Sequence, residues 1–307
     1  MKRLSMIVIA LIVIHLTACG GNNNEQLSDD TTSEKAIHVK EVIPNGLVRT
    51  GLAMSLTLEN AQFQSKVVAL TLDSSDIIVG ASIDELQVDI PINEERPSEI
   101  YSNILTKSEL GDDYGMRSNS KIGKEWYEQV ESLVQFMIGK PLSDILNLST
   151  HQKGSNYQNI SDIPDLVTSV TIDVDELISV VADAAMNAAK PAEAKGSVKT
   201  GLALIAGSEL YSGPNGIDKV EMNSYIAAVT IDATGAIVNA DLNSLEVIVE
   251  SKSGETNVDI NNEWGEQARI FADYFVGEDV DFVALETAPT ESFKAVLDKA
   301  IANINSD

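Results

Sequence analysis

The chain has 307 residues, of which 44% are hydrophobic and 22% are charged. These fractions are those of a globular protein, and they exclude a mostly disordered chain and a protein with several membrane spans. The net charge of −26 disfavours nucleic-acid binding, because an acidic surface repels phosphate backbones. One cysteine and three histidines exclude both a disulfide framework and a zinc site built from cysteine and histidine.

The N-terminus predicts export and lipid anchoring. Lys2 and Arg3 precede an apolar run that is too short to span a bilayer. The run ends in Leu16-Thr17-Ala18-Cys19, and Cys19 is the only cysteine. This arrangement resembles the signal of bacterial lipoproteins, in which the cysteine carries the lipid. The resemblance implies a signal peptide over residues 1–18, lipidation of Cys19 and an extracytoplasmic place on the cell membrane.

Residues 19–36 are polar and rich in Gly and Asn, which is typical of a flexible tether. After the tether the sequence repeats itself. The segment VRTGLA at residues 48–53 returns as VKTGLA at 198–203, and the segment that starts at Trp126 returns at Trp264. Ordered matches of this kind indicate an internal duplication, with copies at 37–190 and 195–307.

In each copy the strands precede the helices. Residues 67–73 and 77–90 in the first copy, and 226–232 and 236–249 in the second, are apolar and predict antiparallel strands. The apolar residues after Trp126 recur every three or four positions, which predicts a helix that Gly139 ends. A second helix is expected over residues 174–189, with Asp173 and Glu176 as a capping box. The pattern predicts an α+β fold, in which each copy has an antiparallel sheet with packed helices.

The segment before this second helix carries a motif. It reads Asp165-Leu166-Val167-Thr168-Ser169-Val170-Thr171. It resembles the end of the FMN-binding domain family, whose pattern is Asp, two variable residues, Ser/Thr, Gly, Ala and Ser/Thr, followed by a helix. The resemblance covers most of the mature chain loosely and implies two tandem FMN-binding-domain-like repeats, of which the second is degenerate.

In that family the last hydroxyl is esterified to FMN by a flavin transferase that uses FAD. By the resemblance Thr171 carries the FMN, and Thr168 and Asp165 are the outer motif positions. Ser82 also ends a Gly-Ala-Ser stretch, but it falls in a predicted strand and is rejected as the carrier.

Two functions stay open. In the first, the protein is a lipid-anchored electron carrier with covalent FMN, a flavin transferase and redox partners at the cell surface, and with no catalytic residues of its own. In the second, it keeps the fold without flavin and serves as a structural or binding lipoprotein. Ser169 and Val170 stand where the family has Gly and Ala, and this difference and the acidic surface favour the second function. A third function, a solute-binding lipoprotein, is disfavoured by the internal duplication without a long α/β pattern.

Overall fold

The computed structural model describes residues 40–59, 62–90, 104–153, 158–161, 163–213, 216–252, 255–262, 264–277 and 288–305. The predicted signal peptide, Cys19 and the tether lie outside the described residues. The described residues all belong to one compact unit, Val39–Asp307.

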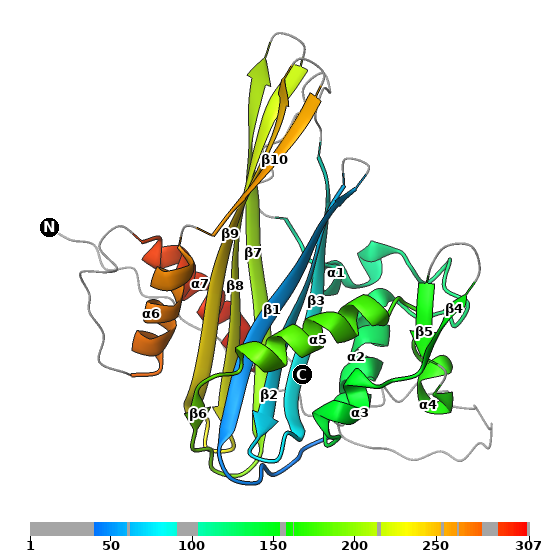
Figure 1. The fold of residues 1–307 in the computed structure, drawn as a ribbon, viewed down its shortest axis with the longest axis vertical. Coiled ribbons are helices and arrows are strands. Elements are labelled where there is room, and N and C mark those ends of the chain that lie inside the picture. The colour runs from blue at the N-terminus through cyan, green and yellow to red at the C-terminus, as the bar shows by residue number, and fades with distance from the viewer. Residues whose placement is uncertain are drawn as a thin grey trace, which may run out of the picture. The chain divides into compact units, whose positions relative to one another are not determined.

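The fold is a mixture of helices and antiparallel sheets, as predicted (Figure 1). One four-stranded sheet has the order β3-β2-β1-β6, a second has the order β10-β9-β8-β7, and β4 and β5 form a small hairpin. The strands are β1 (Val48–Glu59), β2 (Gln62–Asp73), β3 (Ile78–Asp89), β4 (Thr150–Lys153), β5 (Gln158–Ser161), β6 (Pro191–Ala192), β7 (Val198–Gly213), β8 (Gly216–Asp232), β9 (Ile237–Lys252) and β10 (Glu255–Asn261). The helices are α1 (Lys107–Leu110), the 3-10 turn η1 (Gly111–Tyr114), α2 (Trp126–Met137), α3 (Leu142–Leu146), α4 (Pro164–Val167), α5 (Asp175–Asn187), α6 (Gly265–Phe275) and α7 (Thr290–Asn305).

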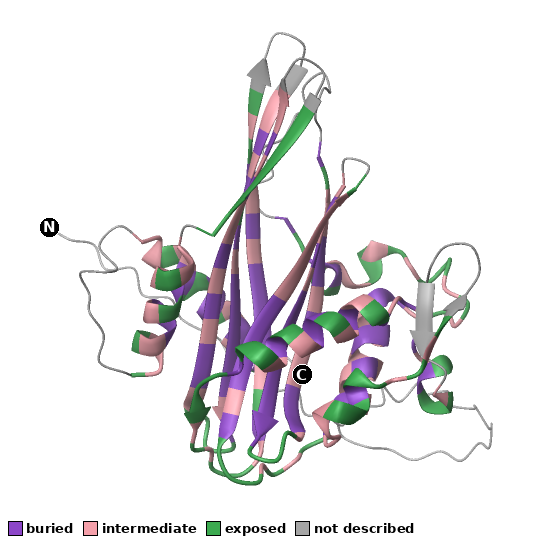
Figure 2. Ribbon diagram, viewed as in Figure 1, coloured by how far each residue is buried: buried purple, intermediate pink, exposed green. Residues whose placement is uncertain are grey.

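The two large sheets pack face to face, and helices cover their outer faces. Strand β2 shows how the sequence produces this arrangement, because successive side chains of a strand point to opposite faces. Val67 and Ala69 lie in the core between the sheets. Val68 and Leu70, which alternate with them, lie in a second core with helices α2 and α5. A third core joins the second sheet to α6 and α7, and Figure 2 shows buried residues along the strands of both sheets.

The two halves repeat the same helix-to-strand contacts. The side-chain amide of Asn187 at the end of α5 donates to the carbonyl of Leu52 at 2.8 Å. Asn303 near the end of α7 donates to the carbonyl of Leu202, also at 2.8 Å. Leu52 and Leu202 are equivalent in the repeated segment, so the duplication seen in the sequence extends to tertiary contacts.

A glycine makes each of these helix contacts possible. A Cβ atom on Gly51 would lie 2.0 Å from the carbonyl oxygen of Ala184, and one on Gly201 would lie 2.2 Å from that of Ala300. Any side chain at either position would therefore push the helix off the sheet. This explains why the Thr-Gly-Leu-Ala core of the repeated segment keeps its glycine.

An aspartate organises the same turn in both halves. Asp73 accepts hydrogen bonds from the backbone N–H groups of Ser75 and Ile77 at 2.8 and 3.0 Å. Asp232 accepts from those of Thr234 and Ala236 at 2.8 and 3.2 Å. The Thr234 hydroxyl, followed by backbone amides, lowers the pKa of Asp232 to about 2, so this carboxylate stays ionised in the turn.

Four threonine hydroxyls meet where the sheets face each other. Thr71 contacts Thr50 at 3.0 Å, Thr230 at 2.9 Å and Thr200 at 2.6 Å between hydroxyl oxygens. Thr50 contacts Thr230 at 2.7 Å, and Thr200 contacts Thr230 at 3.4 Å. Each half contributes two of these residues, so this threonine cluster links the two halves through polar groups that are mostly buried.

The predicted strands and both predicted helices of the first copy are confirmed, and Gly139 follows α2 with φ +80°. The predicted capping box is wrong. Val174 is the N-cap of α5, and Asp173 accepts from the N–H of Asp175 at 3.1 Å. The Glu176 carboxylate is drawn away from the helix start, because it pairs with Lys66 and accepts from Ser55.

Candidate functional site

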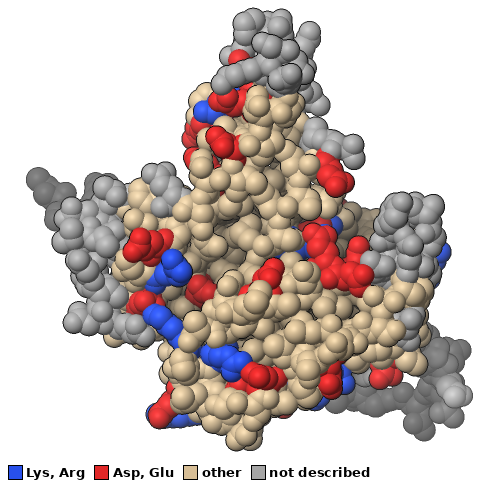
Figure 3. Space-filling view, in the orientation of Figure 1, with Lys and Arg blue, Asp and Glu red and all other residues tan. Residues whose placement is uncertain are grey.

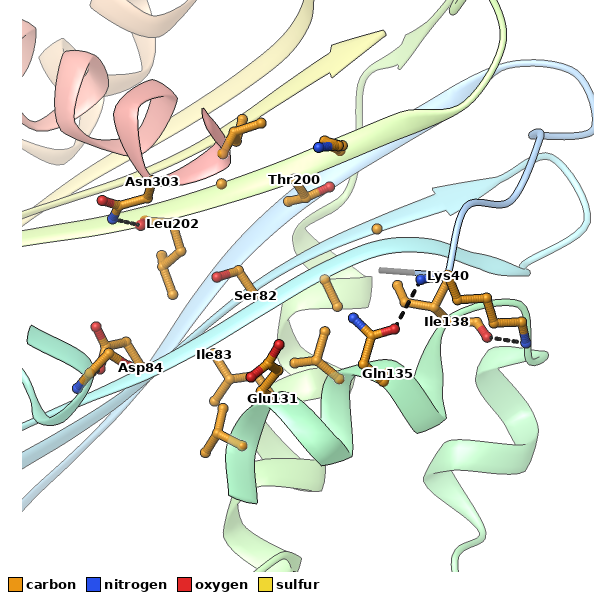
Figure 4. A pocket seen from close by; sticks show the side chains of 18 of the residues that line it. Lys40, Ser82, Ile83, Asp84, Glu131, Gln135, Ile138, Thr200, Leu202 and Asn303 are labelled. Carbon is orange, nitrogen blue, oxygen red and sulfur yellow. Dashed lines mark hydrogen bonds between the residues drawn. The ribbon is translucent and has the colours of Figure 1, made fainter. Parts of the chain in front are cut away.

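A cavity of about 440 Å³ lies between the two halves. We call it cavity A. Helix α2 and strand β3 of the first half line one part of it, and β7 and the end of α7 of the second half line the other. Figure 4 shows Ser82 and Asp84 on β3, Gln135 on α2, and Thr200 and Leu202 on β7 around this space.

Helix α2 supplies the apolar wall of cavity A. Val130, Val134 and Ile138 follow one another at intervals of four residues, so they lie along one face of the helix. Strand β3 contributes small residues to the lining, among them Gly80. A Cβ atom on Gly80 would lie 2.1 Å from the hydroxyl oxygen of Thr200, so the absence of a side chain there lets β3 and β7 approach closely.

Polar groups surround this apolar wall. Lys40 is tied to the helix side, because its N–H donates to Gln135 Oε1 at 3.0 Å and its Nζ donates to the carbonyl of Ile138 at 2.8 Å (Figure 4). Burial raises the pKa of Asp84, and hydrogen bonds from Thr106 and Ser108 partly oppose that rise.

The lining of cavity A carries more negative than positive charge. Its four carboxylates are Glu41, Asp84, Glu109 and Glu131, and its two lysines are Lys40 and Lys199. An anionic group of a ligand would therefore meet an unfavourable potential here.

Thr171 lies away from cavity A. Its N–H and its hydroxyl both donate to Gln129 Oε1, at 2.8 and 3.1 Å. Gln129 is fully buried, and its Nε2 donates to the carbonyl of Lys124 at 3.2 Å. Gln129 directly precedes Val130 on α2, so their side chains are about 100° apart around the helix, and Thr171 does not line either of the two large cavities.

The other two motif residues do not meet Thr171 in a shared site. Asp165 and Thr168 are exposed and lie one turn apart at α4, where Thr168 is the C-cap. Between Thr168 and Thr171, the Ser169 hydroxyl donates to the carbonyl of Asp165 at 3.0 Å, and Val170 is fully buried. The hydrogen bond of Ser169 and the burial of Val170 hold this segment in place.

The start of α5, next to Thr171, already carries negative charge. Asp173 accepts a hydrogen bond from the N–H of Asp175, and burial raises the pKa of Asp173. Both groups occupy the end of the helix where a phosphate is otherwise favoured.

The sequence did not predict cavity A. The spacing of Val130 and Val134 predicts a helix that faces the core, and this is confirmed, because both residues pack in the core of the first half. Local spacing gives no indication that β7, far along the chain, lines the same cavity as this helix. The repeat of Thr50-Gly51 as Thr200-Gly201 indicates that the two halves use matching surfaces.

Among the described residues no cluster of three or more histidine, cysteine, aspartate or glutamate residues could hold a metal ion. No helix in the described part of the chain is long and apolar enough to cross a membrane. Comparisons with protein families, curated proteins and solved structures found no match to this chain.

Proposed function

We propose that this protein is a lipid-anchored, extracytoplasmic binding protein made of two FMN-binding-domain-like halves. Its ligand is a flat ring compound, held without a covalent bond in cavity A, and a flavin is the first compound to test. The observation that carries this proposal is the position of cavity A, which the two halves form together.

The shape and chemistry of cavity A support a ring compound. One wall is apolar, with Val130, Val134 and Ile138, and Gly80 lets strands β3 and β7 approach closely beside it. Ligand sites are typically apolar clefts with a few polar groups that orient the ligand. Tyr127 also lines the cavity, and its ring offers a surface for stacking.

The charge of cavity A makes the proposal more specific. Since carboxylates outnumber lysines in the lining, the phosphate of FMN is disfavoured there. Riboflavin, which has the same ring without the phosphate, is therefore expected to bind at least as tightly as FMN.

Lipid anchoring rests on the N-terminal sequence, where the only cysteine follows an apolar run. A Cys19→Ser variant is expected to leave the membrane fraction of the expressing bacterium and appear in the soluble fraction. A variant that stays with the membrane would remove the lipid anchor from the proposal.

Covalent FMN on Thr171, with electron transfer at the cell surface, is the second candidate. It is favoured by one observation. The Thr171 hydroxyl is only half-buried and is held by a hydrogen bond to Gln129 on a segment without regular secondary structure. Release of that bond would present the hydroxyl to a flavin transferase, which would transfer FMN from FAD and release AMP.

One pair of measurements separates the two candidates. Riboflavin and FMN are titrated into the chain that lacks the signal peptide, with flavin fluorescence as the readout. Ser82 of cavity A is replaced by Phe to fill the cavity, and Ser118, which is exposed and outside the lining, is replaced by Phe as the matched control. Binding that is lost in Ser82→Phe and kept in Ser118→Phe supports the proposal, and failure of both flavins to bind contradicts it.

The second measurement tests the covalent candidate. The chain is expressed with a flavin transferase and examined by intact mass and in-gel flavin fluorescence, with Thr171→Ala as the control. A mass increase of one FMN that disappears in Thr171→Ala would establish the second candidate. The same increase in the variant would exclude Thr171 as the carrier.

A further inference from the structure

A second cavity, of about 750 Å³, lies at the equivalent place in the other half. We call it cavity B. Strand β9 and helix α6 line it from the second half, and β1 and the end of α5 line it from the first. Cavity A has the corresponding set, β3 and α2 with β7 and the end of α7, so the two cavities are related by the internal duplication.

Equivalent positions carry different side chains in the two cavities. Where α2 places Tyr127 and Val134, α6 places Gly265 and Ala272, counted from the two tryptophans that begin the repeated segment. The smaller residues account for the greater volume of cavity B. Among the lining residues of cavity B there is no aromatic side chain, so it offers no surface on which a ring could stack.

The strand that lines cavity B carries an acidic residue where the other strand carries a hydroxyl. Ser82 pairs with Ala69, and Asp241 pairs with the equivalent Ala228. The Asp241 carboxylate accepts a hydrogen bond from the N–H of Leu52 at 3.2 Å, at the edge of β1. A carboxylate can accept about four hydrogen bonds, so it keeps accepting capacity beyond this bond and the one from the N–H of Leu242.

A buried carboxylate is an energetically unfavourable acceptor for the N–H of Leu52. Burial raises the pKa of Asp241 to about 6, while the backbone bonds and the charge of Arg269 partly oppose the rise and Asp273 adds to it. An asparagine would accept from the N–H of Leu52 equally well and would carry no charge into the cavity. Perturbed acidic groups that line cavities are often functional, and here the extra charge faces an open space of sufficient size for a ligand.

A basic side chain lies on the other wall. Arg269 projects from α6, is exposed, and has no hydrogen bond or ion pair with any residue that the structure describes. Three other charged side chains line the cavity. Lys190, which follows α5, and Asp273 of α6 form an ion pair with each other, and Glu266 lies on α6 one turn before Arg269. Figure 3 shows this face, with basic and acidic side chains gathered between α6 and the end of α5.

We propose that cavity B binds a small zwitterion, an amino acid or a short peptide, with its ammonium group on Asp241 and its carboxylate on Arg269. Asp241 supplies acceptors for the ammonium hydrogens, and the guanidinium of Arg269 binds a carboxylate through two parallel hydrogen bonds. The side chains of Asn243 and Asn262, which also line the cavity, add neutral polar contacts. This proposal does not depend on a flavin in cavity A.

The test is calorimetric titration of the chain that lacks the signal peptide, with glycine, L-alanine, L-leucine and the dipeptide Ala-Ala as probes. Ethylamine and acetate, each with one of the two charges, are the control ligands. We expect at least one zwitterion to bind, and neither control ligand to match it. Asp241→Asn and Arg269→Gln are each expected to weaken that binding at least about tenfold.

A matched control is Lys121→Gln, which removes an exposed basic residue that lines neither cavity and should leave the affinity of cavity B unchanged. Circular dichroism verifies that each variant is folded, and Arg269 is exposed, so its replacement leaves the core intact. The proposal is overturned if none of the four probes binds, if ethylamine or acetate binds as tightly as the best zwitterion, or if both variants keep the wild-type affinity.

Discussion

Replacement of Thr71 by valine tests whether the threonine cluster holds the two halves together. Thr71 is fully buried, and its hydroxyl contacts Thr50, Thr200 and Thr230. Valine has nearly the same shape, so Thr71→Val removes these contacts and leaves no cavity. The variant therefore reports on the hydrogen bonds alone.

The expected loss of stability follows from the hydroxyl contacts that remain in the variant. Thr50 and Thr230 keep their mutual contact of 2.7 Å, whereas Thr200 keeps only the 3.4 Å contact with Thr230. The loss of a neutral hydrogen bond and the poor satisfaction of a second hydroxyl each cost about 1 kcal/mol. We expect Thr71→Val to lower the free energy of unfolding by about 2 kcal/mol, from this addition.

The assay is urea unfolding of the mature chain followed by circular dichroism. Thr168→Val, at an exposed position, is the matched control and should unfold at the wild-type urea concentration. The variant with valine at all four positions should lose less than the sum of the four single losses, because replacing whole hydrogen-bonded sets by apolar groups leaves no unsatisfied hydroxyl. Strict additivity, or a Thr71→Val variant as stable as the wild type, would refute the reasoning.

Three further predictions concern stability. Gly51→Ala should lower the free energy of unfolding by about 3 kcal/mol, because the new Cβ meets the carbonyl oxygen of Ala184 at 2.0 Å and helix α5 has to move; a thermal midpoint equal to that of the wild type would contradict this. Lys107→Met should cost about 3–5 kcal/mol in urea unfolding, since it leaves the buried Glu85 carboxylate without its partner at 2.6 Å, and adding Glu85→Leu should restore most of the loss. Asp241 has a pKa of about 6 in the folded chain, against the ordinary 3.8. Its ionisation therefore lowers the free energy of unfolding as the pH rises from about 4 to above 6, by up to about 3 kcal/mol. Asp241→Asn should remove that decline and be more stable than the wild type at pH 7 but not at pH 4, and parallel pH profiles for the two proteins would show that Asp241 does not titrate in this way.

Local spacing predicted several of the long elements but not β1 and β7, whose segments stand out in the sequence only as a repeat. The spacing of Trp126, Val130 and Leu133 predicts α2, because apolar residues at helical intervals lie on one face of a helix. The alternation around Val67 predicts β2, because successive side chains of a strand point to opposite faces of the sheet. The short elements α1, α3 and α4 were missed, because four or five residues contain too little periodicity to distinguish a helical turn from a loop.

The motif at Thr171 illustrates the limit of pattern matching. The sequence places Asp165, Thr168 and Thr171 in one motif. In the structure, Asp165 and Thr168 are exposed at α4, and the Thr171 hydroxyl donates a hydrogen bond to Gln129. Gln129 is 42 residues away along the chain. No spacing rule links the two residues, since their contact depends on how α2 packs against the loop before α5.

The sequence by itself determined that the chain is an α+β protein with two similar halves, because periodicity and internal repetition are properties of neighbouring or aligned residues. Only the tertiary structure decided how the halves face each other. Thr50 and Thr230 are 180 residues apart and touch, and the cavities lie where each half meets the other. The physical reason is that face-to-face packing of sheets is decided by the fit of whole surfaces, and no local pattern encodes that fit.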